Sequence, residues 1–260
     1  MRVESTRFQR PTAGWLSRAI LSGFIATAAM SILFFAAYGL ARIVGAVQLA
    51  DRRGAASFRE WIEALTNNQV LDIAAGSLYA AGALHLALGI VWAALYAYYF
   101  EPHLLGPGWL RGTTFSLIPW ALSLVVFLPL VGGGFLGGAI GAGPLPAIGN
   151  LILHLGYGVT LGTMYGPLGD IAADEFPSAG PVDTPEVVAH YEGAAARGLA
   201  LGAATGAVLG FLVLATAYVQ PNALPPGIPG IAFVAVPTIV GATFGGVLGS
   251  IVGIAPGRTP

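Results

Sequence analysis

Two long stretches of this chain carry no charged side chain. Neither Gly112–Gly169 nor Gly198–Gly257 contains Asp, Glu, Lys or Arg. Each is long enough for two membrane crossings, because one spanning helix needs about 20 apolar residues. Inside a bilayer every backbone amide must be hydrogen-bonded within the protein, and these stretches lack the alternating pattern of barrel strands. The sequence therefore predicts an all-α, polytopic membrane protein.

Six apolar segments predict one transmembrane domain over residues 19–260, preceded by a cytoplasmic tail at residues 1–18. The segments cover residues 19–41, 78–100, 112–131, 148–168, 199–219 and 231–254. Charged side chains gather in two connections, a polar loop at 42–77 and an acidic loop at 170–197. The composition agrees, since 9% of the residues are charged, against about 25% in soluble domains.

The two charged connections are each expected to contain helical residues. In the polar loop, Ser57-Phe58-Arg59-Glu60 fits a capping box, in which the Ser and Glu side chains satisfy backbone amides at a helix start. Four apolar residues then share one helix face: Phe58, Trp61, Ile62 and Leu65. This amphipathic helix either lies flat on the membrane or packs on the bundle, and the pattern fits both. In the acidic loop, Thr184-Pro185-Glu186 predicts the start of a helix that continues into the fifth span.

The distribution of arginine predicts which side of the membrane each connection occupies, because cytoplasmic loops are enriched in basic residues. If the N-terminus is inside, seven arginines lie on the inner side: Arg2, Arg7, Arg10, Arg18, Arg111, Arg197 and Arg258. The outer side then holds four: Arg42, Arg52, Arg53 and Arg59. Both termini are therefore expected in the cytoplasm.

The second and fourth predicted spans share a repeated pattern. The first copy consists of His85, Gly89, Ala93 and Tyr96, and the second of His154, Gly158, Gly162 and Tyr165. At about 100° per residue, the four members of each copy share one helix face. We therefore expect three similar helical hairpins, with the two faces converging and the two imidazoles near each other or near a shared partner. Parallel repeats of this kind occur in transporters, and duplication of a purely structural hairpin produces them as well.

Glycine recurs at every fourth position in the last two spans. One series is Gly198, Gly202, Gly206 and Gly210, and the other is Gly241, Gly245, Gly249 and Gly253. Small residues at this spacing let two helix backbones approach closely. We expect a tight helix-packing contact here, and the alternative is a moving or pore-lining contact.

Absent residue types exclude several classes of activity. The chain has no cysteine and no lysine, which excludes thiolate catalysis, Walker-type phosphate loops and Schiff-base chemistry. It has no zinc-binding motif, and its net charge of −1 indicates no nucleic-acid partner. No carboxylate lies in a predicted span, which argues against a proton- or sodium-coupled carrier. We expect a protein that is not an enzyme, without a metal or a cofactor, whose partners are the lipid bilayer and a second copy or a membrane complex.

His85 and His154 are the candidate functional pair, because tyrosines aside they are the only ionisable side chains near the middle of the predicted spans. They fit an interhelical hydrogen bond, a pH-sensitive or proton-passing pair, or axial ligands of a haem between two helices. The corresponding functions are a non-enzymatic structural, accessory or stress-related membrane protein, a channel or facilitator for protons or a small neutral solute, and a haem-carrying redox subunit.

Two segments resemble a group of bacterial membrane proteins. The segment Gly23–Ser31, rich in Ala and Thr, is similar to the N-terminal helix of the uncharacterised YagU-like proteins. His154-Leu-Gly-Tyr-Gly158, with Gly162 and Tyr165, is similar to their later helix. The resemblance covers about a quarter of the chain. It implies a location in the bacterial inner membrane and implies no activity.

Overall fold

A computed structural model describes residues 14–46, 53–174, 185–219 and 230–254. Every regular element in these ranges is helical, and six helices are long and apolar enough to cross a membrane. The six candidate spans are Trp15–Gly45, Leu78–His103, Gly108–Leu130, Leu145–Gly166, Glu192–Thr216 and Ala232–Gly253. The predicted all-α, six-span fold is therefore confirmed, and each predicted segment overlaps one observed span.

Four of the spans are single α-helices, and the other two continue from an α-helix through π-helical or 3₁₀ turns. The long helices are α1 (Trp15–Ala46), α4 (Leu78–Leu95), α5 (Gly108–Leu122), α7 (Leu145–Asp174), α8 (Pro185–Val219) and α9 (Ala232–Ile254). Helix α4 continues through the π-helical turn η1 (Tyr96–Phe100) and the 3₁₀ turn η2 (Glu101–His103), and α5 through the π-helical turn η3 (Ser123–Phe127) and α6 (Leu128–Leu130). The shorter helices α2 (Arg53–Thr66), α3 (Gln69–Gly76) and η4 (Phe135–Ile140) lie outside the spans.

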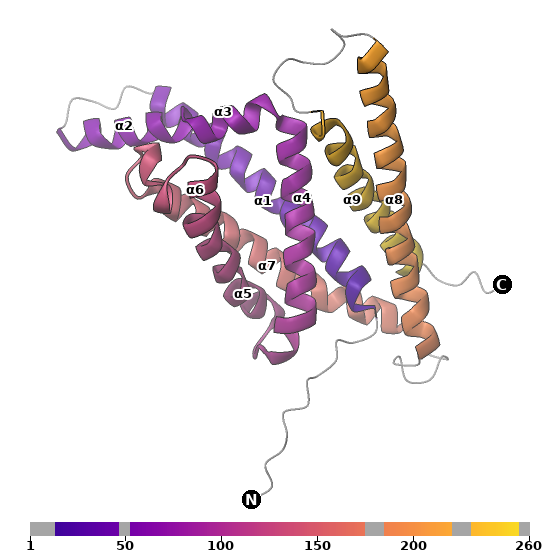
Figure 1. The fold of residues 1–260 in the computed structure, drawn as a ribbon. Coiled ribbons are helices and arrows are strands. Elements are labelled where there is room, and N and C mark those ends of the chain that lie inside the picture. The colour runs from indigo at the N-terminus through magenta and orange to yellow at the C-terminus, as the bar shows by residue number, and fades with distance from the viewer. Residues whose placement is uncertain (1–13, 47–52, 175–184, 220–229, 255–260) are drawn as a thin grey trace, which may run out of the picture.

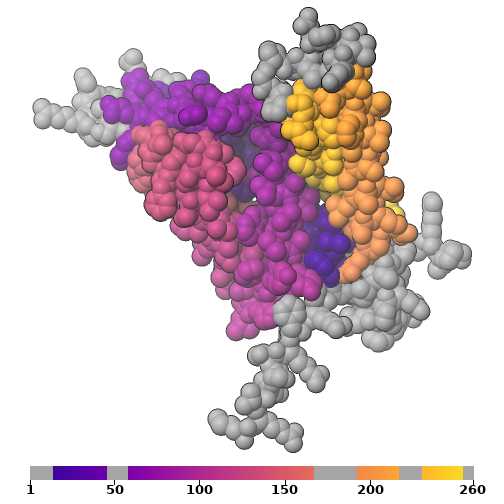
Figure 2. Space-filling view, viewed as in Figure 1, coloured from indigo at the N-terminus to yellow at the C-terminus, as the bar shows by residue number. Residues whose placement is uncertain are grey.

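Helices α1, α4, α5 and α7 form a four-helix bundle, and α8 and α9 form a hairpin beside it (Figure 1). Helix α1 packs on α4 and α7, and α5 packs mainly on α7. The hairpin meets the bundle chiefly through α9, which packs on α1 and α4, and Figure 2 shows it at one side of the molecule. The end of the bundle where α1 begins is called the N-terminal end below, and the opposite end is called the α2–α3 end.

Helices α2 and α3 cross the α2–α3 end at a steep angle to the spans (Figure 1). Helix α2 already begins at Arg53, so the predicted capping box at Ser57 is wrong. The residues before Ser57 include two alanines, which favour helix and extend it backwards. The apolar face of α2 covers protein: Ile62 is 7% exposed and lies beside Gly45, and the Trp61 ring covers Gly143. These contacts favour packing on the bundle.

Helix α8 begins at Pro185 and continues into the fifth span, as the sequence predicted. Proline suits the first turn of a helix because a backbone N–H at that position has no partner within the helix. The predicted cap Thr184 and the rest of residues 175–184 lie outside the described residues.

The two helices of each hairpin touch through small residues. In the α1–α4 hairpin, Gly23 faces Ala93 and Gly89 faces Thr27. In the α5–α7 hairpin, Gly108 faces Gly162 and Gly112 faces Gly158. In the α8–α9 hairpin the facing pairs are Gly198 with Gly245, Gly202 with Gly241, Gly206 with Pro237 and Gly210 with Phe233. A Cβ atom added at any of these glycines would collide with the opposite helix. Gly249 faces Ala194 in the same way, and Gly253 is buried.

Aromatic side chains join the α1–α4 hairpin to the α5–α7 hairpin. The ring of Phe115 lies 5.2 Å from that of Tyr96 and 5.0 Å from that of Phe100, between ring centroids. Tyr165 of α7 packs edge-on against Tyr96, with the centroids 5.7 Å apart. Such aromatic pairs contribute beyond their buried area, so this cluster holds the two hairpins together.

Candidate functional site

His85 and His154 lie toward the α2–α3 end of the bundle. His85 comes two turns after the start of α4, His154 lies in the first third of α7, and both side chains are half-buried. The His154 Nδ1 is 2.9 Å from the carbonyl oxygen of Asn150, so the tautomer with a proton on Nδ1 donates this hydrogen bond. The two imidazoles are within range of an electrostatic interaction. The structure therefore brings the predicted pair to one region.

Polar side chains around the pair tie three helices together. Asn150 Nδ2 donates to Ser123 Oγ at 2.8 Å, which joins α7 to the π-helical turn η3. The Tyr157 hydroxyl donates to the carbonyl oxygen of Gly89 at 2.7 Å, which joins α7 to α4. Hydrogen bonds between spans replace contacts that water would supply elsewhere. This region is therefore a junction between the two hairpins of the bundle.

The repeated residues of α4 and α7 meet each other only in part. Gly89 and Ala93 face α1, whereas Gly158 and Gly162 face α5, so the expectation of fully converging faces is wrong for the small residues. The glycine face of each helix therefore packs on the other helix of the same hairpin. Tyr96 and Tyr165 do meet, at the N-terminal end of the bundle.

A second polar group, missed as a site by the sequence analysis, lies at the N-terminal end. We call it the arginine–tyrosine cluster, and it consists of Arg18, Tyr96, Glu101, Arg111 and Tyr165. The Arg18 guanidinium stacks over the Tyr165 ring, 4.6 Å from its centroid. Arg111 forms an ion pair with Glu101. Both tyrosine hydroxyls are within electrostatic range of Glu101 and Arg111.

The sequence analysis expected no carboxylate in any span, and this expectation is wrong for Glu101. The second span extends to His103 and includes it, because the helical turns η1 and η2 carry α4 beyond the predicted end at Phe100. The acid is tolerated there since Arg111 neutralises it. One signal pointed to it: opposite charges flank the Pro- and Gly-rich turn between the second and third spans.

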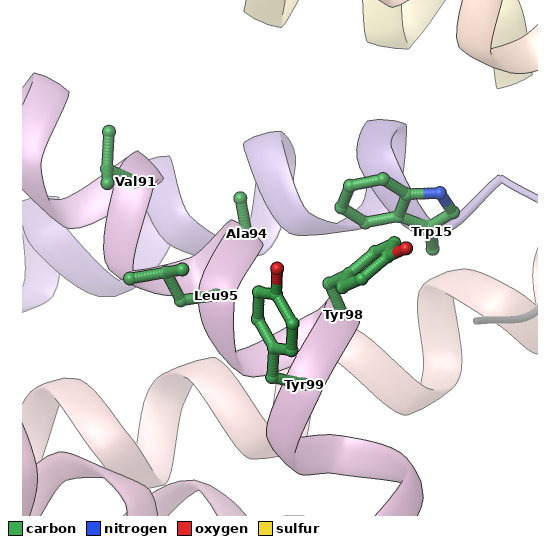
Figure 3. Close-up of a pocket in the computed structure, with 6 residues that line it drawn as sticks. All are labelled: Trp15, Val91, Ala94, Leu95, Tyr98 and Tyr99. Atoms are coloured by element: carbon green, nitrogen blue, oxygen red, sulfur yellow. The ribbon is translucent and has the colours of Figure 1, made fainter. Parts of the chain in front are cut away.

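An aromatic groove opens on α4 near the same end (Figure 3). Its volume is about 320 Å³, and its lining consists of Trp15, Val91, Ala94, Leu95, Tyr98 and Tyr99. The rings of Trp15 and Tyr98 pack edge to face with centroids 5.2 Å apart. Aromatic residues of this kind are typical of the level where hydrocarbon meets lipid headgroups.

The matched region of the chain corresponds to the four-helix bundle. The sequence model of DUF6789, a family of unknown function, matches residues 15–176. The chain belongs to the DUF6789 family. The match begins with α1 and ends just after α7, so this DUF6789 protein carries the α8–α9 hairpin outside the matched region. No curated protein and no solved structure was found to be similar to the chain.

Proposed function

We propose that this DUF6789 protein is a non-enzymatic structural or accessory membrane protein. The observation that carries the proposal is the closed packing of the hairpins, in which small residues place backbone against backbone. Three buried Ser and Thr hydroxyls of the spans bond within their own helices: Ser22 donates to the Arg18 carbonyl oxygen, Thr27 to that of Gly23 and Ser250 to that of Gly246. The hydrogen-bond donor of each of these side chains is therefore satisfied within its own helix, which supports a structural function.

Flux through proteoliposomes tests the proposal. The full-length protein is reconstituted into vesicles that contain a pH-sensitive dye, and an acid step is applied outside. We expect the rate of proton entry to equal that of protein-free vesicles from pH 5 to pH 8. The uptake of a small neutral solute, followed by light scattering, should also be unchanged. Faster entry of protons or of the solute would contradict the proposal that the protein has a structural function.

We infer further that the protein lies in a bacterial inner membrane with both termini in the cytoplasm, and that its three hairpins are internal repeats. The arginine distribution and the even number of spans support this orientation. The recurrence of small-residue contacts in all three hairpins supports the repeat. Reporter fusions at Met1 and at Pro260 test the orientation, and a periplasmic reporter at either position contradicts it. The YagU-like resemblance stays a prediction.

The second candidate function is proton passage or pH sensing at the histidine pair. The placement of His85 and His154 toward the same end of the bundle, on two different helices, supports it, because histidine is the side chain that titrates near neutral pH. His85→Gln and His154→Gln each retain a hydrogen-bonding side chain and lose the titration. Acid-dependent flux or conformational change that both variants abolish would support this function. A visible absorption spectrum of the same preparations tests the haem alternative.

A further inference from the structure

The connection between the third and fourth spans is an uncharged loop rich in glycine. It covers residues 131–144, between the end of α6 and the start of α7, and we call it the glycine loop. It lies inside the stretch Gly112–Gly169, which has no charged side chain. Two of its apolar side chains are exposed, Phe135 by 64% and Leu136 by 45%. Exposed apolar groups that lie together mark contacts with a membrane or with another protein.

Leu136 has a backbone conformation that costs free energy. Its φ of 54° and ψ of 18° lie in the left-handed region, where a Cβ atom is crowded and glycine is the usual residue. The loop uses glycine at other positions with positive φ, such as Gly134 and Gly137. Because Leu136 is nearly half exposed, packing within the described residues offsets only part of the cost. A strained residue that persists in this way indicates a contact beyond the chain itself.

Helices α2 and α3 cover the glycine loop from the α2–α3 end. The ring of Trp61 in α2 lies where a Cβ atom at Gly143 would be, and the Val70 side chain of α3 lies against Gly133. Figure 1 shows the loop directly beneath α2, between that helix and the spans. The exposed side chains of the loop therefore lie on its remaining side, beside the spans.

The neighbouring spans present apolar side chains to lipid up to the loop itself. The third span ends at Leu130, which is 78% exposed, and Ile148 in the first turn of the fourth span is 50% exposed. The charged face of α2 carries the exposed ion pair of Arg59 and Glu63. Each of these two residues is about 200° around the helix from Trp61, so this face points away from the loop. The exposed side chains of the loop thus continue the lipid-facing surface of the two spans.

From these observations we propose that the glycine loop binds the lipid surface at the α2–α3 end. Phe135 and Leu136 insert among the acyl chains next to the headgroups, while α2 and α3 hold the loop at that depth. Removal of both side chains from water offsets the cost of the left-handed backbone at Leu136. This interaction surface goes beyond the structural function proposed above and does not depend on the histidine pair.

Spin labels on single cysteines test the proposal, because the chain itself contains no cysteine. Full-length Phe135→Cys is labelled and reconstituted into vesicles of phosphatidylethanolamine and phosphatidylglycerol. Electron paramagnetic resonance then measures collisions of the label with oxygen, which concentrates in lipid, and with a water-soluble nickel chelate. We expect collisions with oxygen to exceed those with nickel, as at the lipid-facing reference Leu212→Cys, whose residue is 59% exposed. The reference for water is Glu63→Cys on the charged face of α2, which should show the reverse.

A second label at Leu136→Cys should give the same lipid-like result, and both substitutions replace exposed side chains, so packing is preserved. Nickel collisions as frequent as those at Glu63→Cys, at either loop position, would place the loop in water and overturn the proposal. Infrequent collisions with both reagents would mean that a protein, such as a second copy of this chain, covers the loop. That outcome would overturn the lipid contact as well.

Discussion

The four-helix bundle and the α8–α9 hairpin share one kind of contact within hairpins but differ in how they meet their neighbours. In the most apolar part of each span, 22–33% of the residues are buried in the four bundle spans, against 11% in both spans of the hairpin. Aromatic rings and interhelical hydrogen bonds join the hairpins of the bundle. The α8–α9 hairpin meets the bundle through apolar contacts such as Phe24 on Phe244.

This difference separates two roles for side chains in a membrane protein. Small residues let two neighbouring helices form a hairpin, because the backbones themselves make contact. Larger side chains then determine which hairpins assemble, since their shape and hydrogen bonds differ from one face to the next. The end of the family match at residue 176, before α8 begins, agrees with the bundle being a unit of its own.

The largest effect should come from filling a backbone contact in the hairpin. In Gly206→Leu the new side chain would collide with the carbonyl of Pro237, which cannot move without separating α8 from α9. We expect a loss of about 3 kcal/mol in the free energy of unfolding, at the upper end for overpacking. Thermal denaturation in detergent measures it. The control Leu212→Ala changes a side chain that is 59% exposed and should stay within about 0.5 kcal/mol of wild type. Equal losses would show that the two helices do not meet at Gly206.

A smaller loss is expected when the ion pair of the bundle is broken. Glu101→Gln leaves the Arg111 charge uncompensated in a partly buried position. Because both side chains keep some exposure, we expect about 2 kcal/mol, below the cost of breaking a fully buried pair. The matched control is Glu63→Gln, whose pair with Arg59 lies on the surface of α2 and should contribute about 0.5 kcal/mol or less. Chemical denaturation of both variants gives the comparison, and similar losses would show that Glu101 is solvated.

Removing the hydrogen bond between α7 and α4 should have a smaller effect still. Tyr157→Phe keeps the buried ring and removes the hydroxyl that donates to Gly89. The expected cost is about 1 kcal/mol, the usual net value of one hydrogen bond. Tyr79→Phe, in which the residue is 88% exposed, is the control and should be neutral. A Tyr157→Phe variant as stable as the control would mean that this bond does not join the hairpins.

The smallest effect is expected from removing the hairpin altogether. A chain that ends at residue 176 retains all four spans of the bundle and the aromatic contacts between them. We expect it to insert into membranes with four spans and to unfold within about 2 °C of the full-length protein, a shift that corresponds to less than about 1 kcal/mol. Reporter fusions and thermal denaturation check this outcome. Failure to insert, or aggregation in detergent, would show that α9 is part of the folding unit of the bundle.

Much of the fold could be predicted from local sequence, but little of the site. The six spans, the start of α8 at Pro185 and the small-residue spacing of the last two helices are properties of single segments. Ser57 misled the prediction of α2, because a local capping pattern competes with helix-forming residues before it. Glu101 was missed because the π-helical turn η1 continues the span past its most apolar part.

By itself, the sequence determined that the chain crosses a membrane as six helices. It also determined which helix faces carry small residues, since composition and spacing are properties of a single segment. Only the tertiary structure decided which partner each face meets. Gly89 and Gly158 occupy the same place in the repeat, yet one packs on α1 and the other on α5, while Tyr96 and Tyr165 meet each other. The physical reason is that a helix face accepts any surface of matching shape, and that match involves residues far apart in the chain.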